Sequence, residues 1–133
     1  MTEEEILTMK AGRALDIKVV ENVMKGNFMV DEIFGDTEAC NMFEKGELMA
    51  SCLEAPFYAP LRRYSEDISE TQRVVDKLKK NYDIKVEFDH NAEKWEAEFR
   101  KRKGDIGYPV AAAATIPEAI CKAALLTVLE AKK

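Results

Sequence analysis

The last helical segment of the chain, Thr115–Glu130 (TIPEAICKAALLTVLE), constrains the fold more than any other part of the sequence. Thr115 and Glu118 have the TxxE spacing of a capping box, and Pro117 falls in the first turn, where its missing N–H costs little. The residues that follow leave almost no polar face, and a helix of this kind is buried on most sides. We therefore expect a central core helix, whose alanines allow close packing against the small residues of Ala111–Ala114.

The amino end of this helix is also a candidate phosphate site, because the free N–H groups at a helix start attract anions. Thr115 and Glu118, however, already offer oxygen atoms to those N–H groups. The carboxylate of Glu118 also repels anions. The sequence therefore favours a structural role for this segment over a phosphate site.

Three stretches of alternating apolar and polar residues precede the helix and predict β-strands. They are Ile84–Phe88, Trp95–Arg100 and the stretch from Tyr108 to Ala112, separated by turn-forming residues at Asp89–Glu93 and Lys101–Asp105. Such short connections indicate an antiparallel meander. One face of this sheet needs a cover of helices. We expect that face to carry Val86, Trp95 or Phe99, and Val110.

Two further helices are predicted before the sheet. Thr2 and Glu5 form another TxxE capping box, and an apolar stripe with a spacing of four residues follows, which Gly12 is expected to bend or break. The stripe consists of Ala11, Leu15, Val19 and Val23. Ser65 or Asp67 can cap the next helix. That helix carries Ile68, Thr71, Val74, Val75 and Leu78.

Residues 27–63 lie between these two helices and are punctuated by glycine and proline. We interpret them as a variable or partly irregular insertion, with a short helix around Thr37–Phe43. The whole chain, residues 1–133, is then a single domain of the α+β class. Its three-stranded antiparallel sheet is layered with helices in the order α-α-β-β-β-α. The sequence leaves open which sheet face the first helix covers.

Charge and cysteine content narrow the class of protein. No apolar run reaches the ~18 residues of a membrane span, and the acidic amino terminus is unlike a secretory signal, so we expect a cytoplasmic protein. Three cysteines cannot all pair, which argues against a disulfide framework. Residues 1–60 carry 5 basic and 12 acidic side chains, and residues 61–133 carry 15 basic and 13 acidic ones. This balance argues against broad nucleic-acid binding by the first half and leaves the second half undecided.

Basic residues form one dense run, Arg100–Lys103, and one weaker cluster, Arg62 and Arg63. On a sheet turn, such a run could clamp the phosphates of a nucleotide or of RNA, and the two clusters could converge. A charged turn is more often solvated and protects a sheet from edge-to-edge aggregation. The candidate ligand-binding residues are Arg62, Arg63, Arg100, Lys101, Arg102, Lys103 and Thr115.

The sequence contains no familiar catalytic or metal-binding motif. It has no GxSxG, CxxC, HExxH, GxGxxG or P-loop lysine motif, and no pair of carboxylates stands out. The single histidine, His90, is expected in a surface turn. Eleven residues separate Cys40 from Cys52, in place of the two to four of a zinc knuckle, so a Cys40, Cys52 and His90 site is the less favoured alternative. We therefore predict that the protein is not an enzyme and uses no metal or cofactor.

Four aromatic residues of the predicted sheet raise the question of a base-stacking platform. They are Phe88, Trp95, Phe99 and Tyr108. Aromatic residues on alternating strands are more often part of a core, and the sequence favours that interpretation.

Three blocks in order resemble the phage ABA sandwich domain family. AGRALDIKVVENVM (Ala11–Met24) is similar to its opening helix, YSEDISETQRVVDKL (Tyr64–Leu78) to its next helix, and TIPEAICKAALLTVLE to its closing helix. The resemblance implies a sheet layered between helices, in a protein of tailed phages and prophages, and hence a location inside a bacterial host cell. The family implies no catalytic residues. Many relatives carry a CxxC-type pair in the variable middle, where this chain has only Cys40 and Cys52.

Three functions follow as hypotheses. The first is a non-enzymatic phage accessory protein that binds a host protein or sequesters a small anionic nucleotide used as an immune signal, the latter in a pocket of a homo-oligomer. The second is nucleic-acid binding, because the order of elements resembles that of double-stranded-RNA-binding domains and His90 falls in the matching turn. The last helix, however, lacks their basic start. The third is a structural role through homo-oligomerisation.

Overall fold

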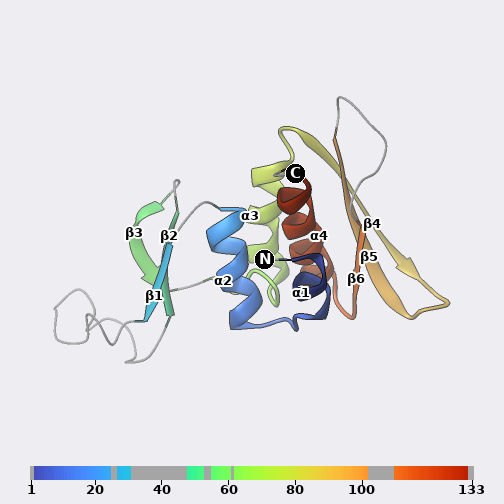
Figure 1. The fold of residues 1–133 in the computed structure, drawn as a ribbon, viewed down its shortest axis with the longest axis horizontal. Coiled ribbons are helices and arrows are strands. Elements are labelled where there is room, and N and C mark those ends of the chain that lie inside the picture. Colours follow the sequence, from blue (N-terminus) through green and yellow to red (C-terminus); the bar gives the residue numbers. More distant parts are fainter. Residues whose placement is uncertain are drawn as a thin grey trace.

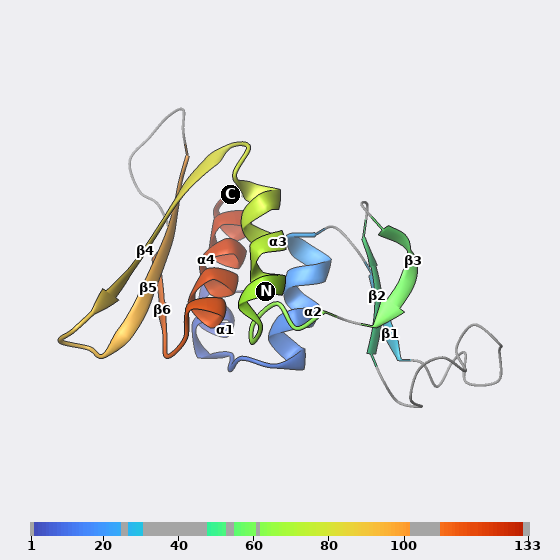
Figure 2. The same cartoon turned by 180° about the vertical axis from the view of Figure 1, so that it is seen from behind.

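The computed structural model describes residues 2–24, 27–30, 48–52, 55–60, 62–101 and 110–131, and of 27–30, 48–52 and 55–60 only the backbone. Helices occupy the middle layer, with one three-stranded sheet on each side of them (Figure 1). The fold class, α+β with a three-stranded antiparallel sheet and helices, is confirmed. The layer order differs from the one implied by the family resemblance, because among the described residues the helices lie between two sheets. Figure 2 shows the same order from behind.

The amino-terminal segment forms two helices, α1 (Glu3–Thr8) and α2 (Arg13–Asn22), and Leu15 and Val19 of the apolar stripe are buried residues of α2. Thr2 caps α1 by accepting a hydrogen bond from the Glu5 N–H at 3.2 Å, as the capping box predicts. The break falls at Gly12, which has a φ of 137°. A side chain at that φ would strain the backbone, so glycine permits the turn between the helices.

Helix α3 (Ile68–Leu78) is capped by Asp67, whose carboxylate accepts from the Ser69 N–H at 2.9 Å. Ser65, the alternative cap, is instead fully buried and bonded to Asp16 of α2. Helix α4 (Ile116–Ala131) begins where Thr115 accepts a hydrogen bond from the Glu118 N–H at 3.4 Å. In α4, all residues from Pro117 to Thr127 except the half-buried Glu118 are buried, so the core position predicted for this helix is confirmed.

The predicted meander is present as β4 (Tyr82–Asp89), β5 (Lys94–Lys101) and β6 (Val110–Ala113), antiparallel and adjacent in that order. Helix α4 lies against one face of this sheet (Figure 1). On β6, Ala111 and Ala113 are buried on that face and Val110 is exposed. The prediction that Val110 faces the helices is therefore wrong. The interface selects the smaller residues because they let the alanine-rich α4 approach closely.

Residues 27–60 contain three strands that the sequence analysis did not identify: β1 (Asn27–Val30), β2 (Leu48–Cys52) and β3 (Ala55–Pro60). They form a second antiparallel sheet in the order β1-β2-β3, next to α2 (Figures 1 and 2). The strands are four to six residues long, and Pro60 stands at the end of one of them. Strands this short, with proline among their residues, lack the alternating pattern by which longer strands are recognised in a sequence. The short helix expected around residues 37–43 falls outside the described residues.

Candidate functional site

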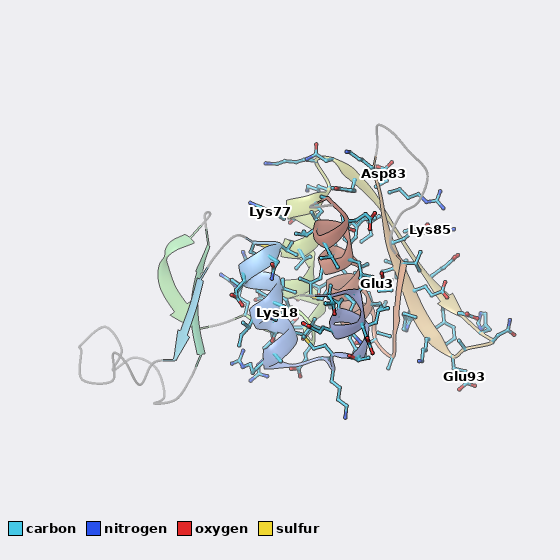
Figure 3. All side chains as sticks on the ribbon, in the orientation of Figure 1. Glu3, Lys18, Lys77, Asp83, Lys85 and Glu93 are labelled. Carbon is cyan, nitrogen blue, oxygen red and sulfur yellow. The ribbon has the colours of Figure 1, made fainter. Side chains whose placement is uncertain are left out.

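The face of the β4–β6 sheet that points away from α4 is the most distinctive surface of the described residues, and we call it the outer sheet face. Alternation along each strand places every second side chain on it. Its members are Asp83, Lys85, Glu87, Asp89, Lys94, Glu96, Glu98, Arg100, Val110 and Ala112. Figure 3 marks Asp83 and Lys85 on this sheet, and Glu93 at the end of its hairpin. In the described part of the chain, no helix covers this face (Figures 1 and 2).

A shallow hollow of about 50 Å³ lies on the outer sheet face. It is lined by Lys85, Glu87, Glu96, Ala97, Glu98 and Val110. Pockets for small molecules usually measure about 300–1,000 Å³. The hollow is therefore too small for a nucleotide and has the size of the tip of one side chain.

The charges on the outer sheet face are unevenly paired. Lys85 Nζ lies 3.5 Å from Glu87 Oε1, and Arg100 Nε donates to Glu98 Oε1 at 2.9 Å. Glu96 stands directly opposite Glu87 in the register, and among the described residues it makes no hydrogen bond or ion pair. Like charges directly opposite one another are destabilising. The face thus has a local excess of negative charge at Glu96.

An apolar residue lies beside these carboxylates. Val110, opposite Glu98 in the register, is 46% exposed, and the next outward residue of β6 is the small Ala112. Charged and apolar groups therefore meet at one place on the sheet, with β6 as the edge strand.

The described residues among those predicted to bind a ligand do not meet within one chain. Arg62 and Arg63 precede α3, whereas Lys101 pairs with Tyr82, which follows α3. The eleven residues of α3 separate these ends by roughly 16 Å. Thr115 lies at the start of α4, next to the opposite end of β5 from Lys101. Arg102 and Lys103 lie outside the described residues.

Several of these basic residues also have acidic partners. Arg62 contacts Glu70 at 3.1 Å, and Glu70 also pairs with Arg73 at 3.0 Å. Arg63 lies 3.9 Å from Glu66. A phosphate bound to Arg62 or Arg63 would compete with these carboxylates.

A buried polar cluster, which the sequence analysis missed, joins α2 to the turn before α3. Asp16 Oδ1 accepts from the Ser65 N–H at 2.8 Å and from the Ser65 Oγ–H at 2.7 Å, and Ser65 Oγ accepts from the Gly12 N–H at 2.9 Å. Asp16 Oδ2 is buried with no partner among the described residues, and burial raises the pKa of this carboxyl. The available signal was an aspartate beside Leu15 within the apolar stripe of α2.

This serine–aspartate pair contains no histidine to accept a proton from the hydroxyl. His90 lies in the β4–β5 turn, where its ring centroid is 5.1 Å from that of Phe88. Both Asp16 and Ser65 are fully buried. The cluster therefore fixes the position of α2 relative to α3 and does not meet a substrate.

A second buried polar contact holds the start of α4 against the amino-terminal helices. Glu118 Oε1 accepts from the Ala11 N–H at 3.1 Å, and Glu118 Oε2 lies 3.2 Å from Lys122 Nζ. Lys122 Nζ also donates to the Leu7 carbonyl at 3.3 Å. Cys121, between these residues, is fully buried, and burial raises the pKa of its thiol. The carboxylate of Glu118 therefore joins α4 to the amino-terminal segment, at the helix end that was the alternative phosphate site.

The aromatic residues divide between core and surface. Phe99 is buried, as the core interpretation requires, and the ring of Tyr82 packs edge-on against it. Phe88 is 36% exposed and packs edge-on against Trp95, with ring centroids 5.1 Å apart. Tyr108 lies outside the described residues. Of the three described aromatic residues, Phe99 is therefore part of the core and does not share an exposed platform with Phe88 and Trp95.

The described residues also bear on a metal site and on a membrane span. No three histidine, cysteine, aspartate or glutamate side chains in this part of the chain are placed to hold a metal ion. The side chains of Cys40 and Cys52 lie outside it. None of the described helices is both long and apolar enough to cross a membrane.

Comparison with known proteins identifies the class to which this fold belongs. The chain belongs to the phage ABA sandwich domain family, whose model matches residues 17–125. Its structure is similar to that of a phage protein from Bacillus cereus ATCC 14579, with 24% identity over 91% of this chain and 92% of that one, and a TM-score of 0.52. At this level of identity, the similarity concerns the fold alone. None of the curated proteins matches the chain.

Proposed function

We propose that this protein is a non-enzymatic accessory protein of a phage or prophage, which acts in the host cytoplasm by binding another protein through the outer sheet face. The observation that carries the proposal is the outer face of the β4–β6 sheet, which none of the described helices covers. On this face the exposed Val110 lies near Glu96, which has no hydrogen-bond or ion-pair partner among the described residues. The family is a phage family. Because a phage protein acts inside a host cell, we favour a host protein, such as a component of a defence system, as the partner.

The described residues favour a protein partner over a nucleotide. The hollow on the outer sheet face is too small for a nucleotide, and its lining is acidic. Among the described basic residues, Arg62 and Arg63 lie apart from Arg100, and each of these three pairs with a carboxylate. Nucleotide sequestration would therefore need a pocket built between protomers.

Affinity capture from infected or lysogenic host cells tests the proposal. Val110→Trp places a bulky neutral side chain on the outer sheet face, and Ile68→Trp does the same at an exposed residue of α3. We expect a captured protein to be lost with Val110→Trp and retained with Ile68→Trp. Thermal unfolding of both variants controls for folding.

Equal capture by the two variants would contradict the proposal, as would a wild-type protein that captures no partner. Thermal-shift measurements against cyclic dinucleotides and ADP-ribose test the nucleotide alternative. Stabilisation by one of these ligands, lost on Arg62→Ala, would favour sequestration instead.

A further inference from the structure

We infer that the hollow on the outer sheet face accepts a lysine or arginine side chain from a basic segment of the partner protein. This inference rests on the proposed function and names the chemistry of its partner.

The lining of the hollow selects for positive charge. Three carboxylates, those of Glu87, Glu96 and Glu98, surround it against one ammonium, that of Lys85, which leaves a formal charge of −2. Lys85 and Arg100 already contact Glu87 and Glu98. Glu96 makes no such contact in the described part of the chain. A cation beside Glu96 would offset its repulsion with Glu87 directly across the strands.

The size and walls of the hollow fit one long basic side chain. A cavity needs about 10–15 Å³ in this measure to hold one water molecule, so about 50 Å³ has room for a group of a few heavy atoms, such as an ammonium or a guanidinium group. Val110 and Ala112 form an apolar border on β6. Lysine and arginine lay their aliphatic stems on apolar surface while the charged head stays at a polar group. Here the stem would lie on Val110 and the head would contact Glu96.

The charge distribution argues against a second copy of this chain as the occupant. A two-fold symmetric contact places the same patch of both copies face to face. In this case Glu87, Glu96 and Glu98 of one copy would meet the same carboxylates of the other. Complementary charge therefore points to a different, basic surface.

A peptide probe tests the inference without the natural partner. The probe is a blocked peptide of alternating lysine and threonine, and the matched control alternates glutamate and threonine. Backbone amide NMR spectra of the full chain report binding residue by residue. We expect the lysine peptide to shift the amides of Glu96, Glu98 and Val110 in a salt-dependent manner, and the glutamate peptide to leave them unchanged.

Matched charge variants separate this site from general attraction to an acidic protein. Glu96→Lys on the outer sheet face and Glu21→Lys on the exposed side of α2 make the same change in net charge. We expect Glu96→Lys to abolish the shifts and Glu21→Lys to retain them. Glu96→Gln should weaken peptide binding by up to about fivefold, the range of a single exposed ion pair.

Three results would overturn the inference: no shift at Glu96 and Val110 with millimolar peptide, equal effects of the two charge variants, or binding of the glutamate peptide. Shifts at Val110 that depend on protein concentration would assign the face to a second copy and overturn it as well. Capture that depends on Val110 but does not change with Glu96→Lys would sustain the proposed function and reject the basic partner. If neither Val110→Trp nor Glu96→Lys changed the capture, the proposed function itself would be rejected.

Discussion

The two faces of the β4–β6 sheet come from alternate residues of the same strands, yet they have opposite properties. The inner face buries Ala97, Phe99, Ala111 and Ala113 against the helices. The outer face carries mainly charged side chains and the exposed Val110. The inner face therefore has little room for substitution, whereas the outer face can change without loss of the fold. This freedom is what a recognition surface requires.

The largest expected effect is on the inner face. Phe99→Ala removes a fully buried ring and should lower the free energy of unfolding by about 3–5 kcal/mol. Val110→Ala on the outer face should change it by no more than about 0.5 kcal/mol. Urea denaturation followed by circular dichroism measures both values. Equal losses would show that the outer face is also part of a packed interior.

Two neighbouring alanines of β6 give a sharper test of the same difference. Ala111→Leu adds volume where α4 packs on the sheet and should destabilise the protein by about 1–3 kcal/mol. Ala112→Leu is the same substitution on the exposed face and should be nearly neutral. Denaturation midpoints decide the result. If Ala112→Leu were the more damaging variant, the assignment of the two faces would be reversed.

Carboxylates on the buried and exposed sides of the sheet should also differ in how much they contribute to stability. Glu118→Ala leaves the Ala11 N–H without its acceptor and the buried ammonium of Lys122 with only the Leu7 carbonyl, and should cost about 1–3 kcal/mol. Glu87→Ala breaks an exposed ion pair and should cost less than about 1 kcal/mol. A double variant, Glu118→Ala with Lys122→Met, is expected to recover part of the loss. If the contacts of Glu118 contributed nothing, the wild type, Glu118→Ala and the double variant would be equally stable.

The smallest expected effect is the pH dependence of the buried Asp16. Burial raises its pKa above 3.8, so the folded protein binds this proton more tightly than the unfolded chain does. The resulting stabilisation is fully present below 3.8 and is lost as the pH rises through the folded pKa. Relative to Asp16→Asn, the wild type should therefore gain stability as the pH falls from about 7 to about 4. Urea denaturation at several pH values measures this difference, and a constant or opposite trend would contradict it.

The helices and the second sheet show how far sequence reasoning reaches. The threonine caps at Thr2 and Thr115, the break at Gly12 and the long apolar run of α4 are local signals, and the structure confirms each. The Glu118 carboxylate, however, binds Ala11 and Lys122. Strands β1 to β3 were missed because their backbone pairing depends on partners up to tens of residues away. Short strands interrupted by proline leave no periodic pattern of their own.

The candidate site was less predictable than the fold. Of the described basic residues that stood out in the sequence, Arg62 and Arg63 lie before α3, whereas Lys101 pairs with Tyr82 beyond its other end. A run of like charges carries no information about its spatial neighbours, so this separation could not be predicted. The outer sheet face stood out only once the register placed Glu87 opposite Glu96 and Glu98 opposite Val110. The Asp16 and Ser65 pair, forty-nine residues apart, was likewise invisible in the linear sequence.

The sequence by itself determined the α+β class, the buried closing helix and the antiparallel meander, because capping and alternation act between residues close in the chain. The tertiary structure alone decided which face of β6 is buried, where the first helices are tied to α4, and that a second sheet lies beyond α2. In β6 both faces are small and apolar, so the alternation is ambiguous. Only the close approach of α4 makes Ala111 and Ala113 interior and leaves Val110 on the surface.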